Sequence, residues 1–362
     1  MGRNYPAIVS CCLAALLLSA CSDGESQTVV VYVSADDHIA RRVIAAFEAQ
    51  TGIDVKDLGD SEAVKTTGHV QRLLNEKDNP RADVFWSSEI FMTITLAEEG
   101  VLAPYESPAT ADWPAAFRDA GNRWYGFAAR ARVIAYAPDR VAPAEVPQTW
   151  QDLADPRLKG RIVMADPRFG TTGGHLGAMK AYWDQTESLG FYEDVFLPSL
   201  AENDVRIIPS GNAGVVRAIV AGEADLGLTD TDDVWAAQAQ GYKVDLVYPR
   251  HGIKEGIAGQ GTLLIPNTVA LVAGGPNPEP AGRFVDFMLS EQVERMLAES
   301  VSHNIPLRPG LAASFSEYAV PDPLAVDYQR AASARGNALD FVMRQFASPT
   351  GGKGGDDRDD ES

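Results

Sequence analysis

The sequence has few cysteines, no excess of basic residues, and no apolar run that is long enough to cross a membrane comfortably. It contains three cysteines in 362 residues, and two of them, Cys11 and Cys12, lie in an N-terminal apolar segment. If that segment is removed, the remaining cysteine cannot form a disulfide or a thiolate metal site within one chain. The formal net charge of −19 argues against a nucleic acid as partner, because phosphate binding needs a basic surface.

Motifs for catalysis are also missing. The sequence has no G-x-S-x-G nucleophile motif, no loop that ends in Gly-Lys-Ser/Thr, and no spaced histidine pair such as HxxxH. We therefore expect a protein that is not an enzyme and has no cofactor. A metal-dependent phosphoesterase that uses clustered aspartates remains an alternative. Each of the five histidines is interpreted as structural or exposed, and His175 lies nearest to a candidate loop.

The N-terminus carries the features of an export signal. Arg3 precedes an apolar segment at residues 7–18, and the sequence Leu-Ser-Ala-Cys ends at Cys21. This pattern resembles the lipobox of bacterial lipoproteins, in which the signal is cut before a cysteine that is then lipidated. We expect a signal peptide at 1–20, a membrane anchor through Cys21, a tether at 21–27, and a mature protein outside the cytoplasm. A plain secretory signal with an incidental cysteine is the alternative.

The rest of the chain alternates between strand and helix patterns. The β-branched run TVVVYV at 28–33 is followed by a helical pattern and a second strand near Ile53. This β-α-β unit predicts an α/β protein with a mainly parallel sheet and helices on its faces. The length is sufficient for two domains. A last helix is expected at about 322–346, and the acidic run at 348–362 is expected to be disordered.

Three aspartates follow one predicted strand within the sequence LGLTDTDDVW at 226–235. In open α/β sheets, ligands bind beyond the carboxyl ends of the strands. Asp230, Asp232 and Asp233 therefore predict a site for a cation, an amine or a hydroxylated ligand. The alternative is helix capping, with Asp230 or Thr231 as the cap and Asp233 in a capping box. Capping alone does not require the third carboxylate.

Polar residues follow other predicted strands as well. Asp36 and Asp37 follow the first strand, where either can cap the next helix, and Asp37 is the slightly better candidate for the cap. Ser88 and Glu89 follow the strand ADVFW at 82–86.

An apolar strand at 124–136 carries Arg130 and Arg132. A buried arginine needs a partner, so both are expected to be paired.

Two loops are candidates for binding an anion. The first, RFGTTGG at 168–174, precedes a helix expected from about His175, and small residues at a helix N-terminus can hold an anion with backbone N–H groups. The second, PSGN at 209–212, also precedes a helix and contains Ser210 and Asn212. A glycine-rich segment at 251–262 is expected to be a crossover or a lid.

Five stretches together are similar to the periplasmic ferric-ion-binding proteins of bacterial ABC importers, within the wider family of extracellular solute-binding proteins. They are VVVYVSADDHIARRVIAAFEAQTGI, RADVFWSSEI, FAARARVIAYAP, LADPRLKGRIVMADP and SHNIPLRP, and the resemblance extends over about residues 29–307.

The resemblance implies a two-lobed periplasmic-binding-protein fold, in which each lobe is a mixed, mainly parallel sheet flanked by helices. A hinge between the lobes closes on the solute. The N-terminal lobe is expected at 28–130 and 262–312, and the C-terminal lobe at 131–261 and 313–347.

The resemblance also implies positions for ligand residues, and the usual metal ligands are replaced. The adjacent tyrosines of ferric binders correspond to Asp232 and Asp233, their histidine after the first strand to Asp36, and their glutamate to Ser88, beside Glu89. The anion-binding positions are retained as Thr172, Gly173, Gly174 and Asn212. Arg130 and Arg132 match the basic strand of the family.

Two classes of solute fit these residues. Ferric iron accepts carboxylate oxygen, so Asp36, Asp232 and Asp233 with a bound anion can hold it. Alternatively, a phosphonate or other zwitterion places its anionic group on the retained loops and its ammonium on Asp232 or Asp233. We place iron first. The complete candidate site is Asp36, Ser88, Glu89, Arg130, Thr172, Gly173, Gly174, Ser210, Asn212, Asp232 and Asp233.

The expected role is that of a monomeric, lipid-anchored binding protein that delivers a small solute to the permease of an ABC importer. A sensor module that reports the ligand to a membrane receptor without transport is a further alternative.

Overall fold

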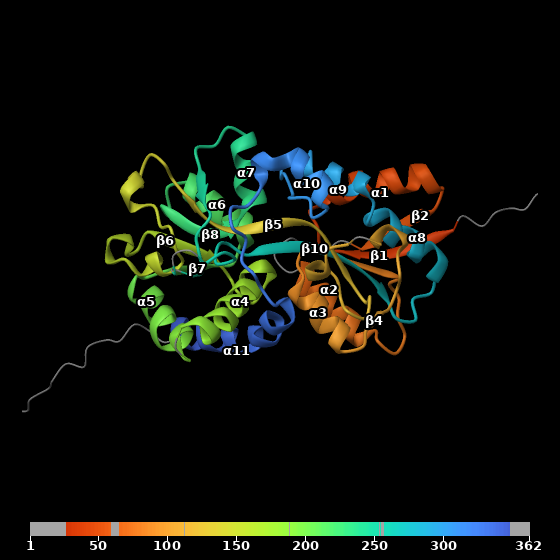
Figure 1. The fold of residues 1–362 in the computed structure, drawn as a ribbon, viewed down its shortest axis with the longest axis horizontal. Coiled ribbons are helices and arrows are strands. Elements are labelled where there is room, and N and C mark those ends of the chain that lie inside the picture. Colours follow the sequence, from red (N-terminus) through yellow and green to blue (C-terminus); the bar gives the residue numbers. More distant parts are fainter. Residues whose placement is uncertain are drawn as a thin grey trace, which may run out of the picture.

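The computed structural model describes residues 27–347, except 59–64, 112, 188, 253, 255 and 256. The expected signal peptide, Cys21 and the acidic run at 348–362 lie outside the described residues. No described helix is both long and apolar enough to cross a membrane. The chain forms two halves that lie side by side along the longest axis of the molecule (Figure 1).

The N-terminal half is built on parallel strands. Strand β1 (Thr28–Val33) pairs in parallel with β2 (Asp54–Leu58) on one side and with β3 (Val84–Ser87) on the other. Apolar side chains from both faces of these strands are buried against helices. The helices of this half are α1 (Asp37–Thr51), α2 (Lys65–Asn75), α3 (Phe91–Glu98), α8 (Pro278–Met288) and α9 (Glu291–Ala298).

The C-terminal half has a second parallel group, in which β6 (Ile162–Ala165) pairs with β7 (Arg206–Ile208) and β8 (Leu226–Asp230). Its helices are α4 (Gly170–Thr186), α5 (Leu197–Glu202), α6 (Gly211–Val220), α7 (Thr231–Ala239) and α11 (Tyr328–Ala347). The short elements of the described chain include β4 (Leu102–Ala103), β9 (Asp245–Val247) and α10 (Pro309–Ala312).

Two long strands join the halves. The first part of β5 (Tyr125–Tyr136) pairs with β10 (Leu264–Val272), and the second part pairs with β8. Both pairings are antiparallel, and the strand order is β2-β1-β3-β10-β5-β8-β6-β7. The prediction of an α/β fold with two lobes of mixed sheet flanked by helices is therefore confirmed (Figure 1). The sheet is not mainly parallel, because β10 and β5 pair antiparallel with every strand that they contact.

A bulge bends β5 where it passes between the halves. Ala128 has a φ of 39°, and the register between β5 and β10 shifts opposite it, between Pro266 and Asn267. The Ala128 N–H donates to the buried Glu294 Oε1 at 3.1 Å, and the Asn267 amide donates to the Ala128 carbonyl. These bonds hold a backbone shape that an alanine rarely adopts, two residues before Arg130.

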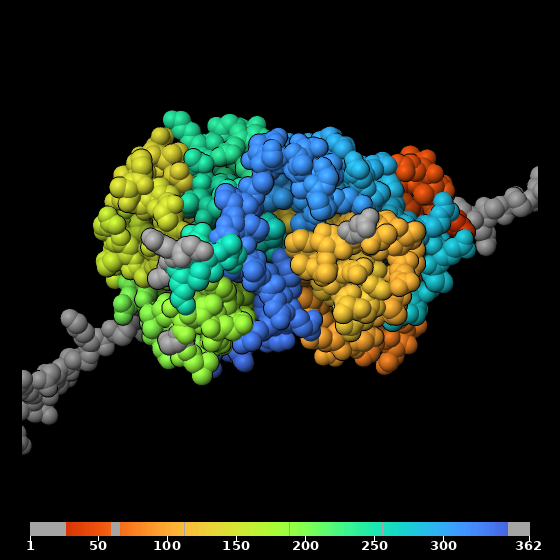
Figure 2. Space-filling model, viewed as in Figure 1, coloured from red at the N-terminus to blue at the C-terminus, as the bar shows by residue number. Residues whose placement is uncertain are grey.

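Helix α11 packs against both halves. Its Tyr328 ring lies 6.1 Å from the ring of Phe91 on α3, whereas Val342 belongs to the core of the C-terminal half. Along α4 the contact is close: a Cβ on Gly177 would lie 2.6 Å from the carbonyl oxygen of Ala331. The blue C-terminal segment accordingly lies between the two halves in Figure 2.

Two predicted helix starts were wrong. Helix α4 begins at Gly170 rather than near His175, so Thr172, Gly173 and Gly174 lie in a helix and not in a loop before it. The last helix begins at Tyr328 and not near residue 322.

Candidate functional site

A polar pocket lies between the halves, where the carboxyl ends of β1, β3, β6 and β8 meet. Arg130, on β5, contributes from the strand that connects them. The N-terminal half contributes residues after its strands, and the C-terminal half contributes the first turns of α4, α6 and α7. The polar lining is Ser34, Asp36, Thr66, Ser88, Arg130, Thr171, Ser210, Asn212, Asp230, Asp232, Asp233, Asn267 and Asn304.

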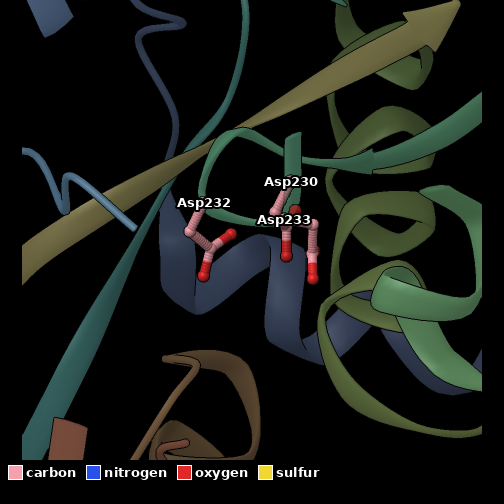
Figure 3. Close-up of side chains that lie close together, drawn as sticks. All are labelled: Asp230, Asp232 and Asp233. Atoms are coloured by element: carbon pink, nitrogen blue, oxygen red, sulfur yellow. The ribbon is translucent and has the colours of Figure 1, made fainter. Parts of the chain in front are cut away.

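Three carboxylates lie together in this pocket, at the junction of β8 and α7. Asp230, Asp232 and Asp233 each offer an oxygen, and these three oxygens lie within 4.8 Å of one another. Figure 3 shows the carboxylates directed to the same side of the chain. Carboxylate oxygens at this separation can ligate one hard cation.

The capping interpretation of this stretch was wrong. Asp230 occupies the N-cap position of α7, but its side chain makes no capping hydrogen bond. Asp233 accepts a bond from the Thr229 hydroxyl at 3.2 Å, which is not the bond of a capping box. The carboxylates are therefore free of the helix-capping role that local sequence suggested.

The buried Asp230 carboxylate is held by donors from three other elements. Its Oδ1 accepts from Arg132 Nη1 at 2.8 Å. Its Oδ2 accepts from the Thr171 hydroxyl at 2.7 Å and from the Asn212 amide at 2.8 Å. Thr171 and Asn212 lie in the first turns of α4 and α6. Both oxygens are thus occupied by donors that suit a negative charge.

Arg132 is fully buried and is positioned by a chain of two histidines. Its Nε donates to His175 Nδ1 at 3.4 Å, and the Nε2 atoms of His175 and His251 lie 3.2 Å apart. The Gly261 carbonyl can only accept, so His251 donates to it from Nδ1, at 2.8 Å. His175 then donates to the bare Nε2 of His251. Burial lowers the pKa of His251 to about 4, and burial together with Arg132 also lowers that of His175.

Arg130 connects the two halves across the pocket. Its Nε lies 3.4 Å from Asp232 Oδ2 and 3.7 Å from Asp230 Oδ2, and its Nη2 donates to the Ser88 carbonyl at 2.5 Å. The side chain is 9 % exposed, and Nε has no hydrogen-bond partner among the described residues. The expectation that both arginines are paired is confirmed.

Asp232 and Asp233 carry raised pKa values. Burial raises the pKa of Asp232 to about 7, opposed by Arg130 and reinforced by Asp230 and Asp36. Burial and repulsion from Asp232 raise the pKa of Asp233 well above its ordinary value. A bound cation stabilises the ionised form of carboxylates that lie this close together.

The N-terminal half forms the opposite wall of the pocket, and the side chains on this wall make fewer hydrogen bonds. Asp36 is the N-cap residue of α1, so the preference for Asp37 as the cap was wrong, but the Asp36 side chain makes no capping bond. Asp37, in the first turn, pairs with Arg41 instead, at 3.9 Å. Ser34 and Ser88 bond to each other, with the Ser88 N–H 2.8 Å from the Ser34 hydroxyl.

Not all of the candidate residues line the pocket. Glu89 is buried, and its carboxylate accepts from the N–H groups of Phe91 and Met92 at the start of α3. Gly173 and Gly174 are packing positions, because an added Cβ would lie 2.2 Å from the Pro167 carbonyl and 2.0 Å from the Phe91 ring, respectively.

Thr172, buried beside them, donates to Asn212 Oδ1 at 3.3 Å. The other candidates, Asp36, Ser88, Arg130, Ser210, Asn212, Asp232 and Asp233, do line the pocket.

Several residues of the site were not in the candidate set. Asn267 and Asn304 give no local signal, because each reaches the pocket through folding of distant segments, whereas Thr171 lies in the candidate anion loop at 168–174. Arg132 and Asp230 had a usable signal, since they are opposite charges on two predicted strands. The antiparallel register of β5 and β8 places them directly opposite each other.

Sequence comparison matches residues 42–324 to the bacterial extracellular solute-binding protein family. The chain is 29 % identical over 310 residues to iron uptake protein A1 of Synechocystis sp., covering 82 % of this chain and 81 % of that protein. It is 26 % identical over 274 residues to a putative 2-aminoethylphosphonate-binding periplasmic protein of Salmonella typhimurium, covering 75 % of each chain.

Structural comparison gives a related result. Iron-bound HitA from Pseudomonas aeruginosa superposes with a TM-score of 0.74 and 25 % sequence identity, covering 88 % of this chain and 99 % of HitA.

Proposed function

Because the chain belongs to the family of bacterial extracellular solute-binding proteins, we propose that it is the solute-binding component of an ABC importer that captures ferric iron. The family consists of binding proteins and not of enzymes, in agreement with the absence of catalytic motifs from the sequence. Relatives that are named for iron, the Synechocystis protein and HitA, support iron as the solute.

The observation that carries the proposal is the group of three carboxylates in the pocket between the halves. Asp232 and Asp233 each offer an oxygen within 4.8 Å of the other, and Asp36 lines the same pocket from the opposite half. Ferric iron is a hard cation that prefers oxygen ligands. We propose Asp36, Asp232 and Asp233 as its ligands, so that metal binding draws the two halves together.

The pocket also has a cationic side. Arg130 and Arg132 lie beside the first turns of α4 and α6, where the helix dipoles favour negative charge. A negative charge on this side of the pocket is therefore part of the proposed binding state, beside the metal.

Two lobes with the predicted boundaries remain part of the proposal: 28–130 with 262–312, and 131–261 with 313–347. The change of partner along β5 supports the boundary near residue 131, because Ala131 pairs with β10 and Arg132 pairs with β8. Residues 130–132 are then both hinge and binding site.

Attachment to the membrane is proposed from the sequence alone. Lipidation of Cys21 after removal of residues 1–20 would hold the protein on the periplasmic face of a membrane, with residues 21–27 as the tether. The permease of the importer is the proposed partner, and the monomer is the proposed state.

The first experiment is metal analysis of the protein without residues 1–20, purified without chelators, together with a thermal-shift screen. A ligand present at 100 times its Kd stabilises a protein by about 2.7 kcal/mol. We expect stoichiometric iron, or a shift in Tm with iron, that is lost in Asp232→Ala and Asp233→Ala and kept in the control Asp340→Ala. Asp340 is exposed on α11.

The competing outcome is a protein that stays metal-free and is stabilised by 2-aminoethylphosphonate. The described lining of the pocket contains no tyrosine or histidine, so its carboxylates also suit a zwitterion. The ammonium group of this zwitterion would contact Asp232 or Asp233. That outcome would replace iron as the proposed solute while leaving the proposed role in import intact.

A further inference from the structure

Asp230 differs from the other two carboxylates of the cluster in how its oxygens are used. Both of its oxygens accept short hydrogen bonds, from Arg132, Thr171 and Asn212. Asp232, by contrast, has an oxygen, Oδ1, that finds no hydrogen-bond partner in the described part of the chain. The hydrogen-bonding capacity of Asp230 is therefore used within the protein, whereas Asp232 keeps an oxygen that can bind a ligand.

The donors around Asp230 form a complete binding site for an anion. Two come from the first turns of helices, Thr171 on α4 and Asn212 on α6, where the dipoles attract negative charge. The third is a guanidinium with 0 % side-chain exposure, and such a charge requires a counterion. A free anion placed here would be bound by the same three groups, but the carboxylate of Asp230 already occupies them.

The first of the two loops expected to hold a free anion, at residues 168–174, is not available for it. Gly173 and Gly174 lie inside α4 and pack against Pro167 and Phe91 with no space for another group. Thr172 is buried and bonds to Asn212, which itself donates to Asp230. Arg132, Thr171 and Asn212 are thus directed at a side chain of the protein. Ser210, of the second candidate loop, lines the pocket without a bond to Asp230.

We propose that the Asp230 carboxylate is a built-in anion, which replaces the free anion that would otherwise accompany the metal. This inference rests on the proposed function. It narrows the solute to a metal ion that binds without phosphate, carbonate or citrate as an obligatory companion. Asp36, Asp232 and Asp233 remain the ligands, and Asp230 supplies fixed negative charge behind them, held by Arg132 and by α4 and α6.

The first test uses the wild-type protein. Iron-loaded protein is passed through a column in a non-coordinating sulfonate buffer, and the retained iron is measured with and without added phosphate or citrate. We expect the same iron content within about twofold in all buffers. Iron that is retained only with an added anion would overturn the inference.

The second test needs no metal and uses chemical rescue. Asp230→Ala removes the carboxylate and leaves space for a small anion beside Arg132. We expect a lower Tm than that of the wild type, and recovery of at least half of the loss with formate, at constant ionic strength set by the bulky gluconate ion. Asp230→Asn keeps the volume and removes the charge, so we expect a lower Tm that formate does not recover.

Wild type and the exposed variant Asp340→Ala serve as controls, and neither should respond to formate. A rise in the Tm of the wild-type protein with formate or phosphate would contradict the inference. So would an Asp230→Ala variant whose Tm does not rise with formate. If that variant does not fold, the wild-type iron measurement decides. A protein that never retains iron fails the proposed function, whereas the metal-free rescue still reports on Asp230.

Discussion

The two walls of the pocket are built differently. On the wall from the C-terminal half, Asp230, Arg132 and Asn212 are buried or half-buried and hydrogen-bonded to one another. On the wall from the N-terminal half, Asp36 is half-buried and its side chain makes no capping bond. The comparison separates two tasks: the hydrogen bonds around Asp230 on the first wall are completed by folding, whereas Asp36 on the second wall is a proposed ligand that is used only when solute is present.

The largest effect is expected from Arg132→Met, which breaks the preformed wall. The substitution leaves Asp230 buried beside Thr171 and Asn212 without its nearest counterion, and with only the more distant Arg130. Removing one partner of a buried ion pair costs about 3–5 kcal/mol, to be measured as the free energy of unfolding in urea. The matched control is Arg140→Met, whose pair with Asp225 is partly exposed and is expected to contribute less than about 1 kcal/mol. Equal losses in the two variants would mean that burial does not distinguish the walls.

The second prediction concerns His251, which supports Arg132 through His175. Burial lowers the pKa of His251 to about 4 from an ordinary value of 6.5. Between pH 4 and 6.5, His251 is therefore protonated in the unfolded chain and neutral in the folded protein. The contribution of His251 to the free energy of unfolding is therefore complete above pH 6.5. It is lost as the pH falls toward 4, and the loss is about 3 kcal/mol. The lowered pKa of His175 acts in the same direction.

We expect His251→Gln to have a flatter dependence of unfolding free energy on pH between 4.5 and 7 than the wild type. Asp232 titrates in the opposite sense, since its raised pKa reduces stability as the pH rises toward 7. The difference between wild type and variant removes that contribution. The exposed His38→Gln is the control, and parallel curves for wild type and His251→Gln would contradict the prediction.

The third prediction concerns the two proposed ligands on the wall from the C-terminal half. Asp232→Ala and Asp233→Ala should each weaken iron binding at least ~100-fold, which is about 2.7 kcal/mol. The metal-free variants should be no less stable than the wild type at pH 8, because the raised pKa values mean that ionising these buried groups disfavours the folded state. Calorimetric titration and urea unfolding measure the two quantities. Unchanged affinity in both variants would remove them from the site.

The smallest effect is expected from the loosely held wall. Asp36→Ala should weaken iron binding about tenfold, or about 1.4 kcal/mol. Its unfolding free energy should change by less than about 0.5 kcal/mol, because no capping bond is lost. A larger loss of stability with unchanged affinity would show that Asp36 serves the helix and not the solute.

The sequence predicted the fold because its signals are local and repeated. Each strand-to-helix unit, such as β1 with α1 or β8 with α7, is visible in one short window of residues. The positions of Asp232 and Asp233 followed from the same rule, since they come directly after a strand. Arg130 and Arg132 could be assigned to ion pairs because charged groups in an apolar strand require partners.

The contacts within the site could not be predicted in the same way. Asp230 has the local pattern of a helix cap, but its partners Thr171 and Arg132 lie 59 and 98 residues away along the chain. Gly173 and Gly174 have the pattern of an anion loop, yet contacts with Phe91 and Pro167 determine their role. In both cases tertiary packing overrides a local preference.

Helix α11 has a consequence for how the protein is made. Residues 328–347 are the last described helix, and they pack against α4, which carries Thr171, and against α3 of the other half. During synthesis, every element that lines the pocket emerges before this helix does. We therefore expect a chain stopped before residue 328 to leave α4 unsupported and to hold no cargo, so that the protein becomes competent to bind only after α11 has emerged.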